Sequence, residues 1–342
     1  MAVSLPGLAA LAALLFTWAQ VGQASKELRI SEQGQITNRF TAAINNLGSD
    51  AIDVRLGGIF ALQRIMQDSA RDHPTVVSIV AAYVRQHAPL KVPTNGKTET
   101  TGNPTLKLPS ADIQAALNVL SRRPENRSEP AVELYLTDLR GIALPVIPNE
   151  STSGGGGKKS SINFRRAVFT GSDLSYAVLD RWDLGNATIE GVTLSNASLS
   201  KANLRRTNFD SADLTDASIC DPLYEVNLEK IDEFACPDLT DASFVEAKLI
   251  DADLTGANLS YSVLCFLASC ANLNGTILDH ANLKDQYLQG ASLKSASLLK
   301  ADLTNADLRK ADLRGADLTG AKLTGAKLDG AKLDGATGLQ RG

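Results

Sequence analysis

Three histidines are the first candidates for acid–base chemistry in this chain: His73, His87 and His280. They fall in an expected helix entry, an expected helix end and a repeat segment, and they share no motif. The sequence contains no phosphate-binding loop, nucleophile elbow or zinc-binding motif. We therefore expect no enzyme activity, no catalytic, cofactor-binding or metal-ligating residues, and no cofactor.

A second candidate is a set of aspartates that recurs at a constant interval at one outward repeat position: Asp173, Asp213 and Asp253. If the repeat forms coils of four pentads, successive members lie two coils apart. That separation is about 9.6 Å on the usual strand spacing. It is too large for a catalytic pair of carboxylates.

All four cysteines lie in the second half of the chain: Cys220, Cys236, Cys265 and Cys270. The first two bracket a degenerate stretch, and the last two bracket a slip in which Leu264 to Leu273 spans nine residues instead of ten. We do not expect the four cysteines to form a metal site. Free, partly buried thiols are the first expectation. A disulfide within each pair is the alternative, if the protein is exported.

Five-residue units fill residues 162–335, and they set the elements that must position every candidate side chain. Each unit has a small residue, a polar residue, a central Leu, Phe or Ile, and two mostly polar residues. A period of five fits neither an α-helix nor a β-strand, so ordinary amphipathic elements are excluded. Fixed self-similarity of this kind indicates a solenoid, with the central and small residues inside.

The pattern A-[DN]-L-x-x, seen clearly from Ala301 to Asn305, resembles the pentapeptide repeat family. That resemblance implies a right-handed quadrilateral β-helix with four pentads in each coil. The degenerate stretch from Ile219 to Leu239 and the interval from Leu144 to Phe164 are each as long as one such coil. We therefore expect the irregular segments to be loops that keep the register of whole coils and leave an otherwise continuous ladder.

Charges near the C-terminus agree with this geometry, because residues four pentads apart would lie one above the other. Five such pairs have opposite charges: Asp302 with Lys322, Asp307 with Lys327, Asp312 with Lys332, Arg309 with Asp329, and Arg314 with Asp334. Lys294 over Arg314 is an exception. Residues 162–342 contain 25 acidic and 18 basic residues, a net charge of −7, so a nucleic-acid-binding surface is not expected.

The segment from Ala2 to Val21 is almost wholly apolar and is about as long as a membrane span requires. Lys26 and Arg29 follow it, which predicts a signal anchor with the bulk of the protein on the cytoplasmic side. A cleaved signal peptide, processed at residues 22–24, and a buried helix are the alternatives. We predict a single-pass membrane protein in which residues 1–24 form the anchor.

Residues 25–124 are expected to form a helical domain that caps the solenoid, and residues 53–62 look like one HEAT-type helix. Such a helix is also familiar in actinobacterial-type, membrane-associated members of the pentapeptide repeat family. Residues 125–161 contain the first repeats and a Gly/Ser-rich loop, and residues 162–342 form the repeat β-helix. The predicted fold class is an α + β-solenoid, with a HEAT-like N-terminal domain before a right-handed quadrilateral β-helix.

A rigid rod with polar faces and no catalytic motif favours a membrane-tethered protein-interaction scaffold. The partner would be an unidentified protein, without direct binding of nucleic acid, and the last repeats could form a homodimer end to end. The family resemblance implies an alternative, since some members imitate DNA with acidic faces and bind topoisomerases such as gyrase. Against that, the most regular repeats cancel their acids with lysine and arginine.

Overall fold

The computed structural model describes residues 5–90, 108–123, 130–145, 162–219 and 269–339. Between the last two ranges it also describes residues 239, 241–250, 252–255, 257, 259 and 262–266. The chain forms two compact units, Met1–Val76 and Val77–Gly342.

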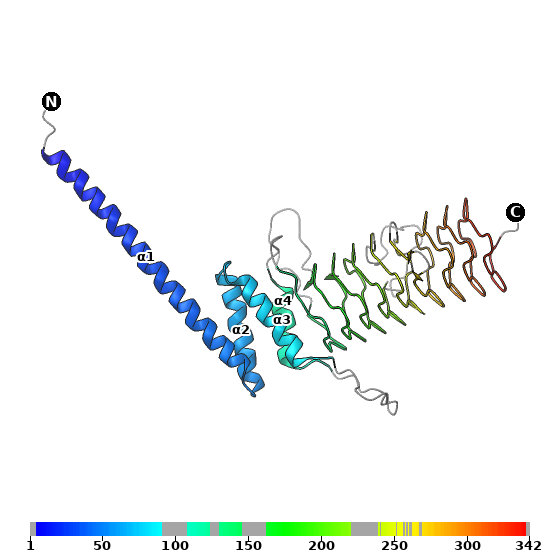
Figure 1. Ribbon diagram of the computed structural model, residues 1–342, viewed down its shortest axis with the longest axis horizontal. Helices are drawn as coiled ribbons and strands as arrows, with labels where there is room; N and C mark the ends of the chain where they lie inside the picture. The colour runs from blue at the N-terminus through cyan, green and yellow to red at the C-terminus, as the bar shows by residue number, and fades with distance from the viewer. Residues whose placement is uncertain are drawn as a thin grey trace. The chain divides into compact units, whose positions relative to one another are not determined.

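The first unit contains two packed helices, α1 (Leu5–Leu47) and α2 (Ile52–Asp68), and the beginning of α3 (His73–His87) (Figure 1). The helices approach closely at Gly58, where a Cβ atom would lie 2.8 Å from the carbonyl oxygen of Ala43. An ion pair of 2.8 Å between Arg39 and Asp68 joins them on the surface. This close packing requires a residue without a side chain at position 58.

The prediction of a membrane anchor at residues 1–24 is wrong. Within the described part of the chain, no helix has an apolar stretch that could cross a membrane, so a single-pass membrane protein is not supported. The wholly apolar run from Leu8 to Phe16 is about 14 Å long as a helix, less than half of a hydrocarbon core. Polar residues and glycines follow it, and α1 then continues without a break through the charged sequence to Leu47.

Two helical segments cover the first coil of the second unit. The C-terminal part of α3 leads into a short segment in which Pro89 pairs antiparallel with Thr137 of that coil. α4 (Ala111–Ser121) contacts β1 (Ile162–Asn163). Arg123, just after α4, donates to the carbonyl oxygens of Leu120 and Asn163, at 2.9 and 2.7 Å. The first edge of the ladder therefore has backbone and side-chain partners.

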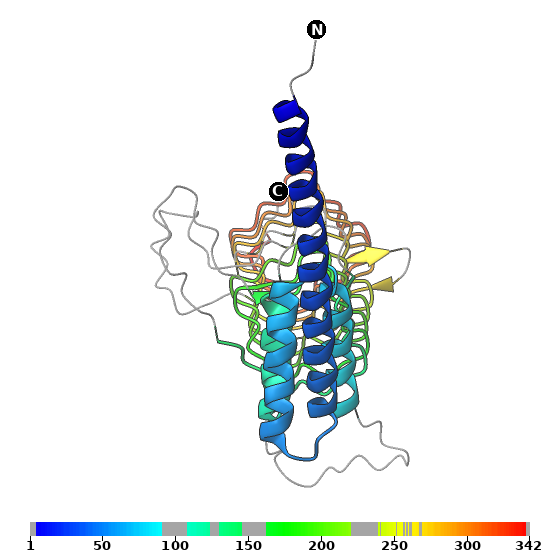
Figure 2. The ribbon, with the colours of Figure 1, turned by 90° about the vertical axis from the view of Figure 1, so that its left-hand side faces the viewer.

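The rest of the second unit is a stack of coils joined by parallel bridges (Figure 1). Most bridges join residues four pentads apart, as in Thr193 with Asp213 and Asp302 with Lys322. One of them is extended enough to form two strands, β1 and β2 (Trp182–Asp183). In Figure 2 the coils are seen nearly along the axis and overlie one another. The predicted coil of four pentads is confirmed.

The ladder continues past both irregular segments, as expected, but the expectation that they keep whole-coil register is wrong. Bridges across both segments join residues seven pentads apart, as in Ala143 with Val178 and Ser218 with Asp253. Each segment is therefore an insertion, three pentads in length, into a single corner. Both insertions leave the ladder after the third central residue of a coil, Leu144 in one case and Ile219 in the other.

The slip at Leu264 is a short insertion closed by a disulfide. β3 (Cys265–Phe266) pairs antiparallel with β4 (Ser269–Cys270), and the hairpin (yellow arrows in Figure 2) projects from the stack. Cys265 and Cys270 are disulfide-bonded, with Cα atoms 4.0 Å apart, so the expected free thiols are wrong for this pair. Cys220 and Cys236 lie outside the described residues.

The core consists of the central residues, as the period predicted. Every described central position from Phe164 to Leu318 is at most 1% exposed, and the small residues before them are buried too. Burial of one such side chain contributes about 1.5–3 kcal/mol, so the stack is held by many similar layers. Large aromatic side chains add contacts between coils. The ring centroids of Phe164 and Trp182, for example, are 4.7 Å apart.

A residue with positive φ ends each well-formed pentad, two positions after the centre. Glycine occupies many of these positions, but others carry side chains in the left-handed region, such as Lys310 at φ 60°. That conformation costs a non-glycine residue about 1–2 kcal/mol. Gly325, at φ 72°, has a further constraint, because a Cβ atom there would lie 2.4 Å from Oδ1 of Asn305.

We expect Lys310→Gly to raise the free energy of unfolding by up to about 1 kcal/mol, because relief of the turn exceeds the added entropy of the unfolded chain. Gly325→Ala is the matched opposite change, and we expect it to lower the free energy of unfolding. Denaturant titrations followed by circular dichroism measure both. A destabilised Lys310→Gly variant would contradict this account of the turns.

Candidate interaction surface of the solenoid

The three histidines do not come together. His73 and His87 lie at opposite ends of α3, and His280 occupies a turn of the solenoid at φ 58°. His87 places Nδ1 3.0 Å from the carbonyl oxygen of Tyr83 and stacks on its ring. Among the described residues, no group of three or more His, Cys, Asp or Glu side chains is arranged to hold a metal ion.

The recurring aspartates Asp173, Asp213 and Asp253 do not all lie on one face. Asp173 and Asp213 lie two coils apart on one face, since each is bridged to Thr193. Asp253 is bridged to Ser218 and therefore lies on the next face. The insertion after Ile219 causes the difference, because it moves later residues by one corner relative to a count of whole coils.

Most of these carboxylates have a local structural role. In the pentad from Ala301 to Asn305, four backbone N–H groups donate to backbone carbonyls of the ladder or of the preceding turn. The fifth, of Thr304, donates to Oδ1 of Asp302 at 3.1 Å. An aspartate or asparagine before the centre thus accepts the one N–H group that the ladder does not use.

This arrangement recurs along the solenoid at N–O distances of 2.8–3.5 Å. The accepting residues are Asp138, Asn163, Asp173, Asp183, Asn203, Asn208, Asp213, Asp253, Asn272, Asn282, Asp302, Asp307, Asp312 and Asp317. It explains why the second position of the repeat prefers these two residue types. The sequence pattern contained this signal, but we expected this position only to face solvent.

Where serine replaces the aspartate, the acceptor comes from the preceding coil. Asp180 accepts from the N–H of Ser200 at 3.0 Å and from the hydroxyl of Ser198. Asp210, Asn274 and Asp279 do the same for the serines of the coils that follow them. These side chains join adjacent coils outside the core.

We expect Asp302→Ala to lower the free energy of unfolding by about 1 kcal/mol, because the N–H of Thr304 loses its acceptor. Asp302→Asn retains an acceptor oxygen and loses only the ion pair with Lys322, which is 3.4 Å long and exposed. Its effect should be less than half as large. Equal losses in the two variants, measured by denaturant unfolding, would show that the ion pair and not the turn is responsible.

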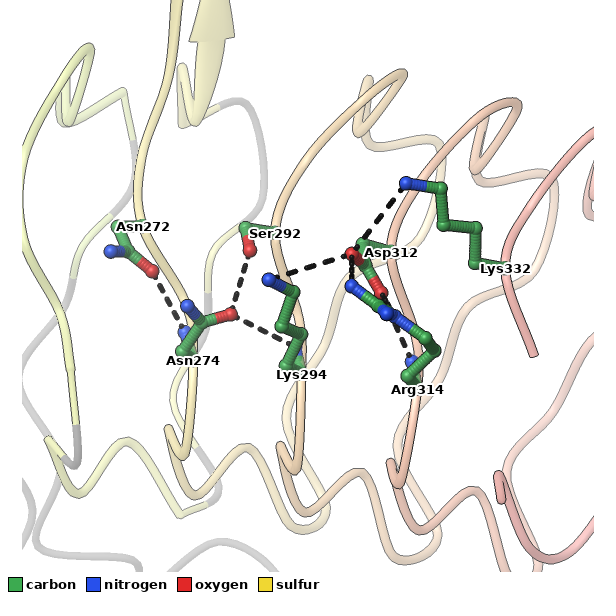
Figure 3. A network of polar contacts seen from close by, with 7 residues as sticks. All are labelled: Asn272, Asn274, Ser292, Lys294, Asp312, Arg314 and Lys332. Atoms are coloured by element: carbon green, nitrogen blue, oxygen red, sulfur yellow. Dashed lines mark hydrogen bonds and ion pairs between the residues drawn. The ribbon is translucent and has the colours of Figure 1, made fainter. Parts of the chain in front are cut away.

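A polar network crosses the last coils on one face (Figure 3). Asp312 accepts two hydrogen bonds from the guanidinium of Arg314, each 2.8 Å long. Lys294, one coil before, and Lys332, one coil after, approach it to 3.7 and 4.0 Å. Asn274 continues the network by accepting from Ser292. Asp312 thus compensates the like charges of Lys294 and Arg314, which the sequence presented as an exception.

Opposite charges were predicted to pair between residues four pentads apart. The structure confirms this for some of the predicted pairs and not for others. Asp302 with Lys322 and Asp312 with Lys332 are ion pairs across coils. Arg309 instead turns back to Asp307 of its own pentad, at 2.8 and 2.6 Å, as Arg314 does to Asp312. The two-residue spacing favours this pairing because both side chains leave the same face.

Hydrogen bonds hold the carboxylates of the last coils in their charged form. The bond from Thr304 lowers the pKa of Asp302, and the bond from Arg309 lowers the pKa of Asp307. Arg314 lowers the pKa of Asp312, and Thr319 lowers that of Asp317. At neutral pH these positions are anionic, while neighbouring lysines and arginines offset their charge.

Residues 189–221, 238–264, 269–304 and 301–337 match the family described as pentapeptide repeats (8 copies). The solenoid belongs to the pentapeptide repeat family. Proteins of this family form right-handed β-helices, so that part of the predicted fold class is confirmed. Neither the membrane association nor the actinobacterial type is supported, and the HEAT-like character of the N-terminal helices is not confirmed.

Several solved pentapeptide repeat structures are similar to the chain. HetL, involved in heterocyst differentiation regulation in the cyanobacterium Nostoc sp. strain PCC 7120, is 31% identical over 60% of this chain and 82% of HetL, with a TM-score of 0.27. Rfr23 from the cyanobacterium Cyanothece 51142 is 31% identical over 36% of this chain and 82% of Rfr23, with a TM-score of 0.26.

A trypsin-treated form of QnrB1, a plasmid-mediated fluoroquinolone resistance protein, is 17% identical over 50% of this chain and 86% of QnrB1, with a TM-score of 0.35. Among curated proteins, none matches this chain. The TM-scores are low throughout, and the family assignment rests on the repeat profile.

Proposed function

We propose that this protein is a non-enzymatic interaction scaffold that presents the faces of its solenoid to a protein partner. The observation that supports the proposal is how each pentad divides its side chains. The central and small residues are buried, and the other residues are mostly polar and face outward. The central residues are sealed inside, and the outward side chains are fixed in columns by the parallel bridges. Successive residues of a column are about 4.8 Å apart, so the faces are rigid templates.

Affinity capture tests this proposal with two variants, each of which is altered on a different part of the solenoid surface. The full chain is immobilised beside two folded variants, Arg165→Gln with Arg205→Gln, and Lys322→Gln with Lys332→Gln. A scaffold should retain one protein at fixed stoichiometry, and one of the two variants should lose it. Retention of no protein, or equal retention by a denatured control, would contradict the proposal.

The charges of the last coils do not favour a DNA mimic that occupies gyrase. The described carboxylates of the last coils accept hydrogen bonds from backbone N–H groups, and several of them also pair with lysine or arginine. A continuous negative face of the kind that duplex DNA presents is therefore not evident there.

We also propose that the last coil forms a homodimer contact. The central residues Leu323, Leu328 and Leu333 are half-buried, whereas the described central residues from Phe164 to Leu318 are at most 1% exposed. A second copy would cover this layer. Sedimentation velocity should show a dimer that Leu328→Lys converts to a monomer, while Lys322→Gln leaves it unchanged. A strictly monomeric wild-type chain would exclude the contact.

A further inference from the structure

We infer that an opening between two coils, beside the disulfide hairpin, binds a short extended segment of a partner protein; this inference rests on the proposed scaffold function and assigns it a site. The opening is a cavity of about 340 Å³, lined by residues 262–265 of one coil and residues 282 and 284–287 of the next. Pockets that bind ligands have volumes of about 300–1,000 Å³. The opening is therefore large enough for a few residues of peptide.

The parallel ladder is interrupted at the opening. On the face before it, the N–H of Leu259 donates to the carbonyl oxygen of Asn282 at 3.3 Å, whereas the other central residues that donate to the next coil do so at 2.7–3.1 Å. One pentad later, the same register would join the N–H of Leu264 to the carbonyl oxygen of Tyr287. No such bond occurs among the residues that the structure describes. The two coils therefore diverge from Leu259 onward.

The hairpin that follows Leu264 accounts for this divergence. At an intact corner, the N–H of Gly275 donates to the carbonyl oxygen of Lys294 in the next coil, at 2.8 Å. The equivalent carbonyl oxygen beside the hairpin belongs to Gln289, and Sγ of Cys270 lies 3.5 Å from it. The disulfide thus lies at the edge where the two coils would otherwise be bonded.

The interruption leaves strand-like backbone groups unused on both sides of the opening. Within the described part of the chain, four of them have no hydrogen-bond partner: the carbonyl of Ser262, the N–H of Leu264, and the N–H and carbonyl of Tyr287. One residue of an inserted parallel strand can pair with Ser262 and Leu264, while its two neighbours pair with Tyr287. Unpaired edges of this kind accept strands from other chains.

The side chains around the opening favour an uncharged segment with an apolar residue at its centre. Val263 and Tyr287 are 39% and 42% exposed on consecutive coils, so an apolar side chain between them would contact both. Lys284 and Asp285 are exposed at the rim with opposite charges, which favours neither an acidic nor a basic segment. Because Leu264 is only 1% exposed, the interior is closed and the flanking residues must be small.

Amide hydrogen exchange of the full chain, followed by NMR, tests this site. The probe is an acetylated and amidated hexapeptide, Ser-Gly-Val-Gly-Thr-Ser. In the free protein, the amides of Leu264 and Tyr287 should exchange at least about tenfold faster than that of Ile277, which donates to Ala252 at 3.0 Å. Saturation with the peptide should slow the exchange of Leu264 and Tyr287 and leave that of Ile277 unchanged.

Two matched variants locate the binding. Val263→Arg fills the opening and should weaken peptide binding about tenfold or more. Ile277→Arg is the control, because Ile277 is 37% exposed at the same repeat position but is bridged to both Asp253 and Ser297. It should change the affinity less than about twofold. Methylation of the valine nitrogen in the peptide removes a backbone donor and should also weaken binding about tenfold. Circular dichroism establishes that both variants fold.

Four results would overturn the inference. The first is slow exchange of Leu264 and Tyr287 in the free protein, and the second is no binding at peptide concentrations up to about 5 mM. The others are equal losses in the two arginine variants and undiminished binding of the methylated peptide. If Val263→Arg retains a captured partner that one of the variants altered elsewhere on the solenoid loses, the scaffold function stands and this site fails.

Discussion

Replacing Phe244 with alanine is expected to lower the free energy of unfolding of the solenoid by about 3–5 kcal/mol. Phe244 and Phe209 are fully buried in consecutive coils, and their rings stack in parallel with centroids 4.9 Å apart. The two coils are joined through the insertion after Ile219, so this stack contributes contact between layers that are distant in sequence. The loss should appear as a lower midpoint in denaturant, measured by circular dichroism.

Tyr287→Ala is the matched control, because it also removes an aromatic ring, but one that is 42% exposed at an outward position. Its effect should be below about 1 kcal/mol. Phe209→Ala with Phe244→Ala should cost less than the sum of the single changes, since either one already breaks the stack. A Phe244→Ala variant as stable as Tyr287→Ala would contradict the assignment of the two rings to one interior stack.

Acid is expected to destabilise the solenoid strongly once the pH falls below about 4. The folded-state pKa values of Asp302, Asp307, Asp312 and Asp317 are lowered by hydrogen bonds from the residues two positions later. A lowered folded pKa stabilises the protein above the unfolded pKa of an aspartate, and that contribution is lost as the pH falls from there toward the folded value. Thermal unfolding at several pH values between about 7 and about 2.5 measures the change.

The matched control replaces these four aspartates with asparagine. The amide oxygens still accept backbone N–H groups, but they do not titrate, so the variant should lose less stability between neutral and acid pH. Its stability at neutral pH should be lower than that of the wild type, since the ion pairs are gone. A wild-type midpoint that stays constant down to pH of about 2.5 would show that these carboxylates do not support the fold.

The regular features of the fold were predictable because each depends on one repeating position. The centres from Phe164 to Leu318 are buried where the period placed them, and the bridge of Asp302 to Lys322 spans the expected four pentads. These features need no knowledge of distant contacts.

The irregular features were not predictable, because more than one arrangement satisfies the same period. The interval between Ile219 and Leu239 fits one lost coil as well as one corner step with a long insertion. Backbone pairing of Ser218 with Asp253 distinguishes them. The apolar composition of Ala2 to Val21 likewise suggested a bilayer span, although the uninterrupted apolar run is short. Side-chain choice at Arg309, between partners in two coils, depends on geometry that spacing does not encode.

The shared corner at which both long insertions depart has a consequence for how such rods tolerate growth. Extra sequence added there lengthens one edge while the remaining three sides keep unbroken columns of matched neighbours. Evolution can therefore add further loops along that edge, one after another, without changing the surfaces on the other sides.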